Sequence, residues 1–261
     1  MIDGRQKISA FIITKNEAAK IDACLDSLGW ADEIVVVDDL SSDGTDEICR
    51  RHGVRIKQHP FNGFKDQKSY AMSLTTHDWV LEIDADERVS PKMKESILNL
   101  SSADFESNDC FEFKRLTNFW GKWIRHSSFY PDYKGRLYYK HNGVWSKGNV
   151  HERFIPTGTT RRLDGDIIHD QDLDLLTYLQ RTARYANLSA LDLHTQGKRV
   201  KWHHVSIRPV YTFLYRYVVR RGFLDGMAGL VISVMGGVGT FLKYMRLYEL
   251  QRKSARSPVD A

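Results

Sequence analysis

The chain has 261 residues, of which 42% are hydrophobic; this composition allows a packed core and excludes a disordered or fibrous protein. Its cysteines, Cys24, Cys49 and Cys110, have no metal-ligand spacing, which argues against a zinc site, a disulfide framework and thiol chemistry and favours a reducing cytoplasm. The net charge of +5 is uneven, because residues 198–256 hold twelve Lys and Arg against two acidic residues, and such a basic region suits nucleic acid or an anionic membrane surface.

Strands and helices are predicted to alternate through the first 100 residues. Apolar, β-branched runs predict the strands, and amphipathic runs between them predict the helices. We expect strands at 7–14, 33–38, 54–57 and 79–83, and helices at 18–28, around 48–49, at 66–74 and at 92–100. A strand at 111–116 and a long helix at 172–193 follow. This alternation predicts an α/β fold with a mostly parallel sheet flanked by helices.

Polar and acidic residues stand where three of these strands end: Thr14 and Asn16, then Asp38 and Asp39, then Asp84 and Asp86. Ligands of open α/β sheets bind beyond the carboxyl ends of the strands. Carboxylates that follow a buried strand repel each other unless a cation compensates, and Mg²⁺ or Mn²⁺ binds through one or two of them while water and phosphates fill its other positions. Neither a Gly-x-Gly-x-x-Gly fingerprint nor a P-loop occurs in the sequence. The strand ends therefore suggest a nucleotide and a metal, although Asp-x-Asp alone is also typical of a solvated loop or helix cap.

Five segments together resemble family 2 glycosyltransferases, and within that family the bacterial lipopolysaccharide-core glucosyltransferases. They are Ile-Ile-Thr-Lys-Asn-Glu at 12–17, Ala-Asp-Glu-Ile-Val-Val-Val-Asp at 31–38, Ser-Asp-Gly-Thr at 42–45, Gly-Phe-Lys-Asp-Gln-Lys at 63–68 and Trp-Val-Leu-Glu-Ile-Asp-Ala-Asp-Glu-Arg-Val at 79–89. The resemblance implies a GT-A (Rossmann-like) fold, a nucleotide-diphosphate-sugar donor, a divalent metal (Mg²⁺ or Mn²⁺) and transfer with inversion.

By motif position, the resemblance also implies which residues bind the donor: Thr14, Asn16, Glu17, Asp38, Asp39, Lys68, Asp84 and Ala85. Thr14 and Asp39 would contact the base, and Lys68 would approach the nucleotide or the diphosphate. Asp84 and Asp86 would serve the ribose and the metal, with Asp86 as the metal ligand.

The second half of the chain offers candidates for the acceptor side and for the catalytic base. Residues 119–145 are rich in aromatic side chains, most of which we expect in the core, with Trp120 and Trp123 as candidates for stacking on an acceptor sugar. Single-displacement transfer needs a base beside the acceptor hydroxyl, and Glu152 in Gly-Asn-Val-His-Glu is the candidate. His151 and His169 are candidate metal ligands; for His169 in Asp-Ile-Ile-His-Asp, which we expect to follow a strand, a structural role is the alternative.

The C-terminal region predicts helices that lie on a membrane. A basic interfacial helix is indicated by four apolar residues on one face, with two arginines off it: Phe213, Leu214, Tyr217 and Val218, then Arg216 and Arg220. Seventeen uncharged residues follow at 226–242, a length that is marginal for a membrane span and includes five glycines. We expect these helices on the inner face of the cytoplasmic membrane, touching anionic lipid. A soluble helical hairpin that covers the acceptor site is the alternative.

Taken together, the sequence predicts a glycosyltransferase domain at 1–197, with a nucleotide-binding half at 1–100 and an acceptor half at 101–197, and a basic amphipathic helical region at 198–261. The predicted activity is transfer of glucose from UDP-glucose to a lipid-linked saccharide such as lipopolysaccharide core. A polyprenyl-phosphate or other cell-envelope glycosyltransferase is the alternative acceptor class. We expect no nucleic-acid partner, although a nucleic-acid-binding protein that uses the basic tail is the alternative outside enzymes. A sugar-nucleotide pyrophosphorylase would need a Gly-rich basic loop that residues 12–17 do not provide.

Overall fold

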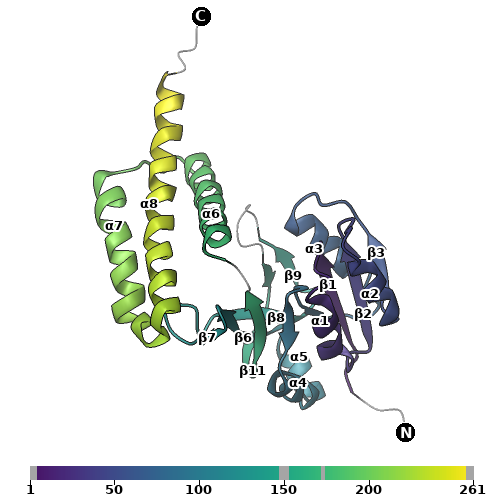
Figure 1. Cartoon of the computed structure of the whole chain (residues 1–261). Coiled ribbons are helices and arrows are strands. Elements are labelled where there is room, and N and C mark those ends of the chain that lie inside the picture. Colours follow the sequence, from purple (N-terminus) through teal and green to yellow (C-terminus); the bar gives the residue numbers. More distant parts are fainter. Residues whose placement is uncertain (1–4, 147–152, 172–173, 257–261) are drawn as a thin grey trace, which may run out of the picture. The chain divides into compact units, whose positions relative to one another are not determined.

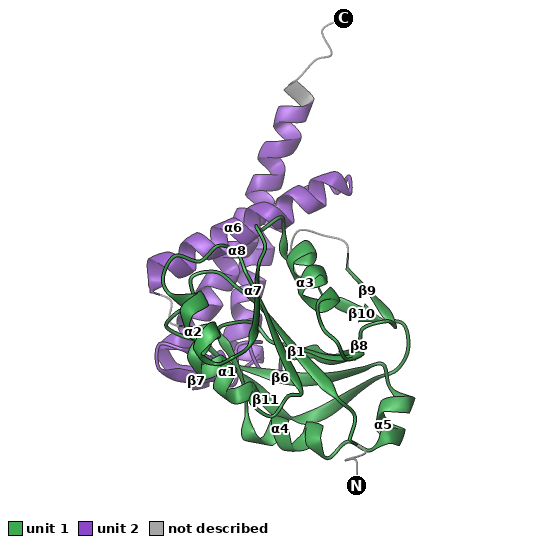
Figure 2. Cartoon of the chain, turned by 90° about the vertical axis from the view of Figure 1, so that its right-hand side faces the viewer, with its two compact units in different colours: residues 1–117, 132–147, 152–170 green, residues 118–131, 148–151, 171–261 purple. Residues whose placement is uncertain are grey.

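A computed structural model describes residues 5–146, 153–171 and 174–256 (Figure 1). The chain divides into two compact units, shown in green and purple in Figure 2. The first unit comprises residues 1–117, 132–147 and 152–170, and the second comprises residues 118–131, 148–151 and 171–261.

The first unit is built on one mixed sheet with helices packed against it. Its strands follow the order β3-β2-β1-β4-β8-β6-β11-β5. Their bounds are β1 Ile8–Thr14, β2 Glu33–Asp38, β3 Arg55–Gln58, β4 Trp79–Glu82, β5 Glu87–Val89, β6 Cys110–Phe119, β8 Tyr133–Tyr139 and β11 Thr160–Gln171. The helices are α1 Ile21–Leu28, α2 Thr45–Arg51, α3 Phe64–Ser73, α4 Pro91–Leu98 and α5 Ser102–Ser107. A separate two-stranded sheet pairs β9 (Gly143–Trp145) with β10 (Phe154–Pro156).

The sheet changes from parallel to antiparallel pairing at β4. The pairs β1–β2, β1–β4 and β2–β3 are parallel. The pairs β4–β8, β6–β8 and β11–β5 are antiparallel. The arrangement confirms the predicted α/β sheet flanked by helices. The antiparallel pairs add β5, β6, β8 and β11 to the sheet, and of these four the sequence predicted β6, as a strand at 111–116.

Alternation along each strand divides the core between the two faces of the sheet. Ile8, Ala10 and Ile12 of β1 pack into one cluster with α1, α4 and α5. Phe11, between them, packs on the other side with α3 and with Phe154 of β10. Successive side chains of a strand point to opposite faces, so a continuous apolar run is the pattern expected for a strand that is covered on both sides.

Element boundaries differ from the sequence expectations by a few residues. Helix α1 begins at Ile21 instead of 18, because the backbone first turns: Asn16 has a φ of 53° and Lys20 N donates to Glu17 O at 2.9 Å. Helix α3 begins at Phe64, two residues earlier than expected, directly after Gly63, which has a φ of 107°. The turn before α1 places Asn16 and Glu17 in a loop beside the end of β1.

The second unit consists of β7 (Lys122–Ile124) and a group of helices. These are α6 Leu175–Thr195, α7 Trp202–Leu214, a π-helical turn η1 Tyr215–Val219, a 3-10 turn η2 Gly222–Asp225 and α8 Gly226–Arg256. Helices α6 and α7 both pack along α8 (Figure 1). Within the described residues, one helical segment, Gly222–Ser254, is long and apolar enough to cross a membrane by length and composition alone.

The glycines of α8 explain why α7, η1, η2 and α6 can approach it closely. A Cβ atom at Gly229 would lie 1.9 Å from the carbonyl oxygen of Gly222, and one at Gly236 would lie 2.8 Å from the Arg216 side chain. A Cβ atom at Gly237 would lie 3.0 Å from Pro209 O. The small residues that weaken 226–242 as an isolated membrane span are therefore contact positions within the second unit.

The apolar face predicted for 213–218 is divided in the structure. Phe213 and Tyr217 are half-buried and stack with their ring centroids 5.5 Å apart, whereas Leu214 and Val218 are exposed. The prediction assumed a regular α-helix with these four residues on one side. The helix instead changes to a π-helical turn at Tyr215, and of the four residues only Leu214 and Val218 lie on its exposed side.

Candidate functional site

The carboxyl ends of β1, β2 and β4 meet at one edge of the sheet of the first unit. Thr14 and Asp38 are paired positions of the parallel strands β1 and β2. Asp39 N donates to Thr14 O at 2.9 Å, and Ile83 N donates to Phe11 O at 3.2 Å, which continues the β1–β4 pairing beyond Glu82. The polar residues that follow these strands in the sequence are thus brought together.

The Asp38–Asp39 pair is fully engaged with its surroundings. The buried Asp38 carboxylate accepts hydrogen bonds from the hydroxyl and, at 2.9 Å, the amide of Ser41. Asp39 Oδ2 accepts from Lys15 Nζ at 2.6 Å, and Asp39 Oδ1 accepts from Phe61 N at 3.0 Å. The Lys15 hydrogen bond outweighs partial burial and, with that of the Phe61 amide, holds the pKa of Asp39 below its ordinary value, so this side chain presents a carboxylate.

Thr14 and Asn16 differ in how their polar atoms are used. The Thr14 hydroxyl is buried and has no hydrogen-bond partner among the described residues. A buried polar group without a partner costs about 1–3 kcal/mol, so an unmet hydroxyl at a strand end suits a ligand that supplies the partner. Asn16 instead connects the loop after β1 to the loop after β2. Its side-chain Oδ1 accepts from Ser42 N at 2.9 Å, and its backbone N–H donates to Ser41 Oγ at 2.8 Å.

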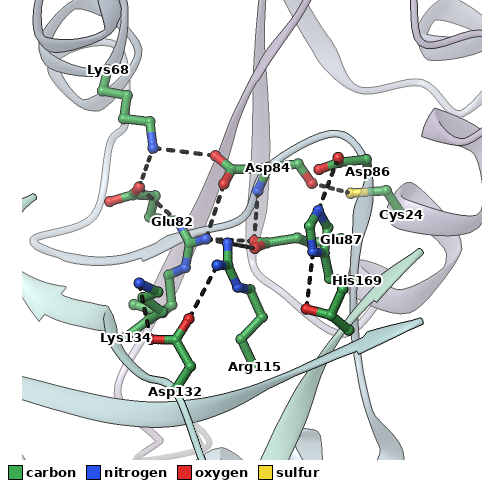
Figure 3. A network of polar contacts seen from close by, with 12 residues as sticks. Cys24, Lys68, Glu82, Asp84, Asp86, Glu87, Arg115, Asp132, Lys134 and His169 are labelled. Carbon is green, nitrogen blue, oxygen red and sulfur yellow. Dashed lines mark hydrogen bonds and ion pairs between the residues drawn. The ribbon is translucent and has the colours of Figure 1, made fainter. Parts of the chain in front are cut away.

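Next to Asp84 lies a buried network of charged side chains (Figure 3). Lys68 Nζ lies 2.6 Å from Glu82 Oε1 and 3.2 Å from Asp84 Oδ1. Arg136 Nη1 donates to Glu82 Oε1 at 2.8 Å, and its Nη2 donates to Asp84 Oδ2 at 3.0 Å and Glu87 Oε2 at 2.6 Å. Lys68, Glu82, Glu87 and Arg136 are all buried, so their charges are neutralised mainly by each other.

Three pKa shifts follow from this network. Burial alone would raise the pKa of Asp84, but Lys68 and Arg136 outweigh it and hold that pKa well below its ordinary range. Burial raises the pKa of Glu87, and the negative charge of Asp84 raises it further. Arg136 and Arg115 lower this pKa but do not outweigh the two effects. Desolvation would lower the pKa of Lys68, but Asp84 and Glu82 reverse it, so the ammonium stays charged.

Asp86 forms a second polar group at the same edge, together with His169 and Glu17. Asp86 Oδ2 lies 3.2 Å from His169 Nε2, while His169 Nδ1 lies 3.4 Å from Thr117 Oγ1 (Figure 3). His169 is 3% exposed and lies inside β11, not after a strand as the sequence suggested; β11 continues to Gln171. Burial, followed by the charge of Asp86, raises the pKa of Glu17, which is half-buried.

The donor atoms of Asp86 and His169 fit a hard divalent ion. Two neighbouring ligands of an octahedral ion with bonds of about 2.1 Å are about 3 Å apart, close to the 3.2 Å between Asp86 Oδ2 and His169 Nε2. No group of three or more His, Cys, Asp or Glu side chains that could hold a metal occurs within the described ranges. A metal here would therefore take one carboxylate and one imidazole and complete its shell with water and phosphate, as Mg²⁺ and Mn²⁺ do.

The remaining predicted residues lie outside this group. Ala85 is buried in the hydrophobic core, so its backbone is what it can offer a ligand. Trp120 and Trp123 belong to the second unit and are 41% and 37% exposed. Glu152 and His151, the candidate base and a candidate metal ligand, lie outside the described residues.

Sequence reasoning missed three charged residues of the network around Asp84, namely Arg136, Glu82 and Glu87. Each is a charged residue within or next to a buried strand: Glu82 follows Val80 and Leu81 in β4, and Arg136 precedes Leu137 in β8. A charged residue inside an apolar strand run is rarely buried without a partner, and this was the signal available in the sequence.

Comparison with known proteins agrees with this architecture. Residues 9–162 match the family model described as Glycosyl transferase family 2. An uncharacterized glycosyltransferase of Rickettsia prowazekii is 31% identical over 261 residues, covering 95% of this chain and 89% of that protein. The lipopolysaccharide core biosynthesis glycosyltransferase LpsC of Rhizobium meliloti is 27% identical over 260 residues, covering 97% and 96%. The mannosyltransferase PcManGT of Pyrobaculum calidifontis, solved with GDP-Man and Mn²⁺, has a similar fold with a TM-score of 0.50 at 14% identity, covering 98% of this chain and 77% of that one.

Proposed function

Because the chain belongs to glycosyl transferase family 2, as its sequence motifs predicted, we propose that it transfers glucose from UDP-glucose to a lipid-linked saccharide with inversion. The observation that carries the proposal is the edge where β1, β2 and β4 end. There the Thr14 hydroxyl, which has no hydrogen-bond partner among the described residues, and the Asp39 carboxylate stand where β1 and β2 end, and Asp86 follows β4 and lies against His169 of β11. Such an edge suits a ligand that has a base at one end and a diphosphate at the other.

The donor would be recognised mainly by groups already held in place. Thr14 Oγ1 and the Asp39 carboxylate would meet the uracil ring, the carboxylate accepting from the ring N–H. Asp84 would accept from ribose hydroxyls in the ionised form that Lys68 and Arg136 enforce. The remaining donor residues, Asn16, Glu17, Asp38, Lys68 and Ala85, would shape and charge the same edge.

Asp86 and His169 would hold the divalent cation. When bound, Mg²⁺ or Mn²⁺ supplies a Lewis acid for the leaving diphosphate. The chain's own contribution is to orient these two side chains, because His169 is buried within β11 and contacts Thr117 through its other ring nitrogen. Burial alone would raise the pKa of Asp86, but the hydrogen bond to His169 outweighs it, so Asp86 is available as an anion at neutral pH. His151 stays a further candidate ligand.

Glu152 remains our candidate for the base that takes the proton from the acceptor hydroxyl. Its test is Glu152→Gln, which should abolish transfer and leave donor affinity unchanged. A variant that loses donor affinity as much as rate would remove Glu152 from that role. Trp120 and Trp123, both partly exposed, would stack on acceptor sugars.

A lipopolysaccharide-core type of acceptor is supported by the relationship to LpsC, whose similarity spans nearly the whole of both chains. We accordingly place the enzyme in the cytoplasm, at the inner face of the membrane. Residues 1–100 would bind the donor, residues 101–197 would add the acceptor side, and residues 198–261 would bring the enzyme to its lipid-linked substrate. The alternative acceptor is polyprenyl phosphate, to which the same donor would transfer its sugar.

The proposal is tested first by melting temperatures with UDP, GDP and CDP, each with and without Mn²⁺. A ligand at about 100 times its Kd stabilises the native state by about 2.7 kcal/mol, which is a rise of about 5–10 °C for a chain of this size. We expect such a rise with UDP and Mn²⁺ together. Asp86→Asn should lose the Mn²⁺-dependent part of this rise. Asp164→Asn, at an exposed position of β11, is the matched control and should keep it. No shift with any nucleotide would refute the donor site, and a shift with GDP alone would refute the choice of UDP.

A further inference from the structure

Helix α7 exposes a stripe of large apolar side chains. The exposed fractions are 53% for Ile207, 57% for Val210, 63% for Tyr211, 48% for Leu214 and 55% for Val218. Their spacing of three, four, seven and eleven residues places them along one side of the helix and its π-helical extension. We call these five residues the α7 face.

The fold of the second unit does not require the α7 face to be covered. The opposite side of α7 makes the contacts with α8: Pro209 and Phe213 lie against Gly237, and Arg208 contacts Tyr244. Phe223 and Leu224 in η2 are likewise exposed, at 48% and 51%. A soluble protein seldom exposes so many large apolar side chains on one element without a partner.

The charges around this face are of one sign. Lys201, Arg220 and Arg221 are exposed. Between residues 198 and 248 the sole acidic residue in the sequence is Asp225, which is 2% exposed and accepts hydrogen bonds from the amide and the ring of His126. The exposed charged groups of this segment are therefore all cationic.

Apolar side chains bordered by cations match an anionic bilayer better than a second copy of the chain. In a two-fold dimer the same face would meet itself, bringing like charges together. A bilayer surface accepts aliphatic and tyrosine side chains at the boundary of the acyl region and attracts Lys and Arg to its headgroups. Helix α8 need not insert, because its glycines are already in contact with α7, η1 and η2.

We propose that the α7 face, together with Phe223 and Leu224, docks in the plane of an anionic lipid bilayer. The inference deepens the proposed function, since an enzyme whose acceptor is lipid-linked must work at that surface. The occupant is the lipid bilayer itself, bound through apolar side chains and headgroup charge.

The experiment is sedimentation of the full chain with vesicles of phosphatidylcholine alone or mixed with phosphatidylglycerol. The wild type should bind the mixed vesicles and, at physiological salt, bind the neutral ones at least about tenfold more weakly. The triple variant Val210→Ser, Tyr211→Ser, Leu214→Ser should lose at least tenfold in partitioning, since each removes apolar area from the lipid. Lys201→Gln with Arg220→Gln should weaken binding about fivefold per charge.

Two control variants keep the proposal falsifiable. Leu176→Ser on α6 removes a side chain that is 69% exposed in the same unit and should leave vesicle binding unchanged. Phe241→Ser on α8 should also leave it unchanged; if Phe241→Ser abolishes binding and the triple variant does not, α8 is the lipid contact and the proposal is overturned. A concentration-dependent dimer that the triple variant dissolves would identify the face as a self-association surface and likewise overturn it.

The nucleotide melting shift separates this proposal from the proposed function. All α7-face variants should keep the shift with UDP and Mn²⁺, because the donor residues lie in the first unit. Vesicle binding without any nucleotide shift would refute the glycosyltransferase site and leave the membrane face standing. A normal shift with vesicle binding unaffected by the triple variant would refute the membrane face. Binding to DNA that is as strong as binding to vesicles would refute it as well.

Discussion

Replacing Arg136 with methionine tests whether the buried charge network holds the acidic strand end. Methionine keeps most of the apolar volume and removes a guanidinium that contacts Glu82, Asp84 and Glu87 at 2.6–3.0 Å. Those three carboxylates would then share Lys68 and Arg115, and Arg115 Nη1 lies 3.8 Å from Glu87. The substitution leaves buried negative charge without its nearest compensation.

The magnitude follows from burial. Breaking a buried ion pair by removing one partner costs about 3–5 kcal/mol, and three carboxylates lose a partner here, so we expect the upper part of that range. A loss of about 4–5 kcal/mol lowers the melting temperature of a chain of this size by about 10–20 °C. Exposed Arg162, which pairs with Glu112 at 3.1 Å, is the matched control, because Arg162→Met should cost at most about 1 kcal/mol.

The pKa shifts also predict how the stability lost by Arg136→Met changes with pH. The pKa of Asp84 is lowered in the folded protein, so this carboxylate stabilises the fold above its unfolded pKa near 4 and loses that contribution as the pH falls. Without Arg136 the pKa values of Asp84 and Glu87 rise, and both groups can take up protons in mild acid. The gap in stability between wild type and variant should therefore be largest at neutral pH and narrow towards pH 5.

The assay is urea unfolding of wild type, Arg136→Met, Arg136→Lys and Arg162→Met at neutral pH and near pH 5. Arg136→Lys should recover part of the loss, because an ammonium keeps the charge but does not span Glu82 and Glu87. A loss for Arg136→Met that is no larger than that for Arg162→Met, and equal at both pH values, would show that the network does not carry the stability assigned to it.

Three further predictions concern single positions. Asp86→Asn should abolish transfer and the Mn²⁺-dependent part of nucleotide binding in a thermal-shift titration; undiminished activity would remove this carboxylate from the site. Glu17→Gln should stabilise the ligand-free protein at neutral pH, because the pKa of Glu17 is raised in the fold and its charged form therefore destabilises the fold above that pKa. The gain in stability should vanish near pH 4, where Glu17 is protonated in both the folded and the unfolded chain. An equal melting temperature of variant and wild type at neutral pH contradicts this. Gly165→Ala should lower the free energy of unfolding by about 2–5 kcal/mol, because its Cβ atom would lie 2.3 Å from the backbone of α4. Gly63→Ala has a similar positive φ but open space around the Cβ atom and should cost about 1–2 kcal/mol; equal losses would show that backbone strain, not the clash, decides.

The acidic edge was predictable because its parts are local. Each strand was visible as an apolar run, and each was followed directly by the polar residues now found at its end, such as Thr14 and Asp38. Parallel strands necessarily bring their carboxyl ends to the same edge of the sheet, so the order of elements sufficed to gather these residues. The family motifs carried the same information.

The residues that support this edge could not be assigned from the sequence. Arg136 is 54 positions from Glu82 and 49 from Glu87, and His169 is 83 positions from Asp86. Their meeting depends on the antiparallel pairing of β8 with β4 and of β11 with β5. A charged residue within a strand signals that some partner exists, but its identity is fixed by strand order and register.

In the C-terminal region, too, some features could be predicted from the sequence and others could not. Its helices, basic charge and glycines were evident in the sequence, whereas the exposed side of α7 was not, because the glycines of α8 determine which side of α7 can approach it. The sequence by itself therefore determined most elements of the first 100 residues and the acidic edge, which depend on neighbouring residues. The tertiary structure decided which charges neutralise one another and which apolar side stays exposed, because both depend on contacts between residues far apart in the chain.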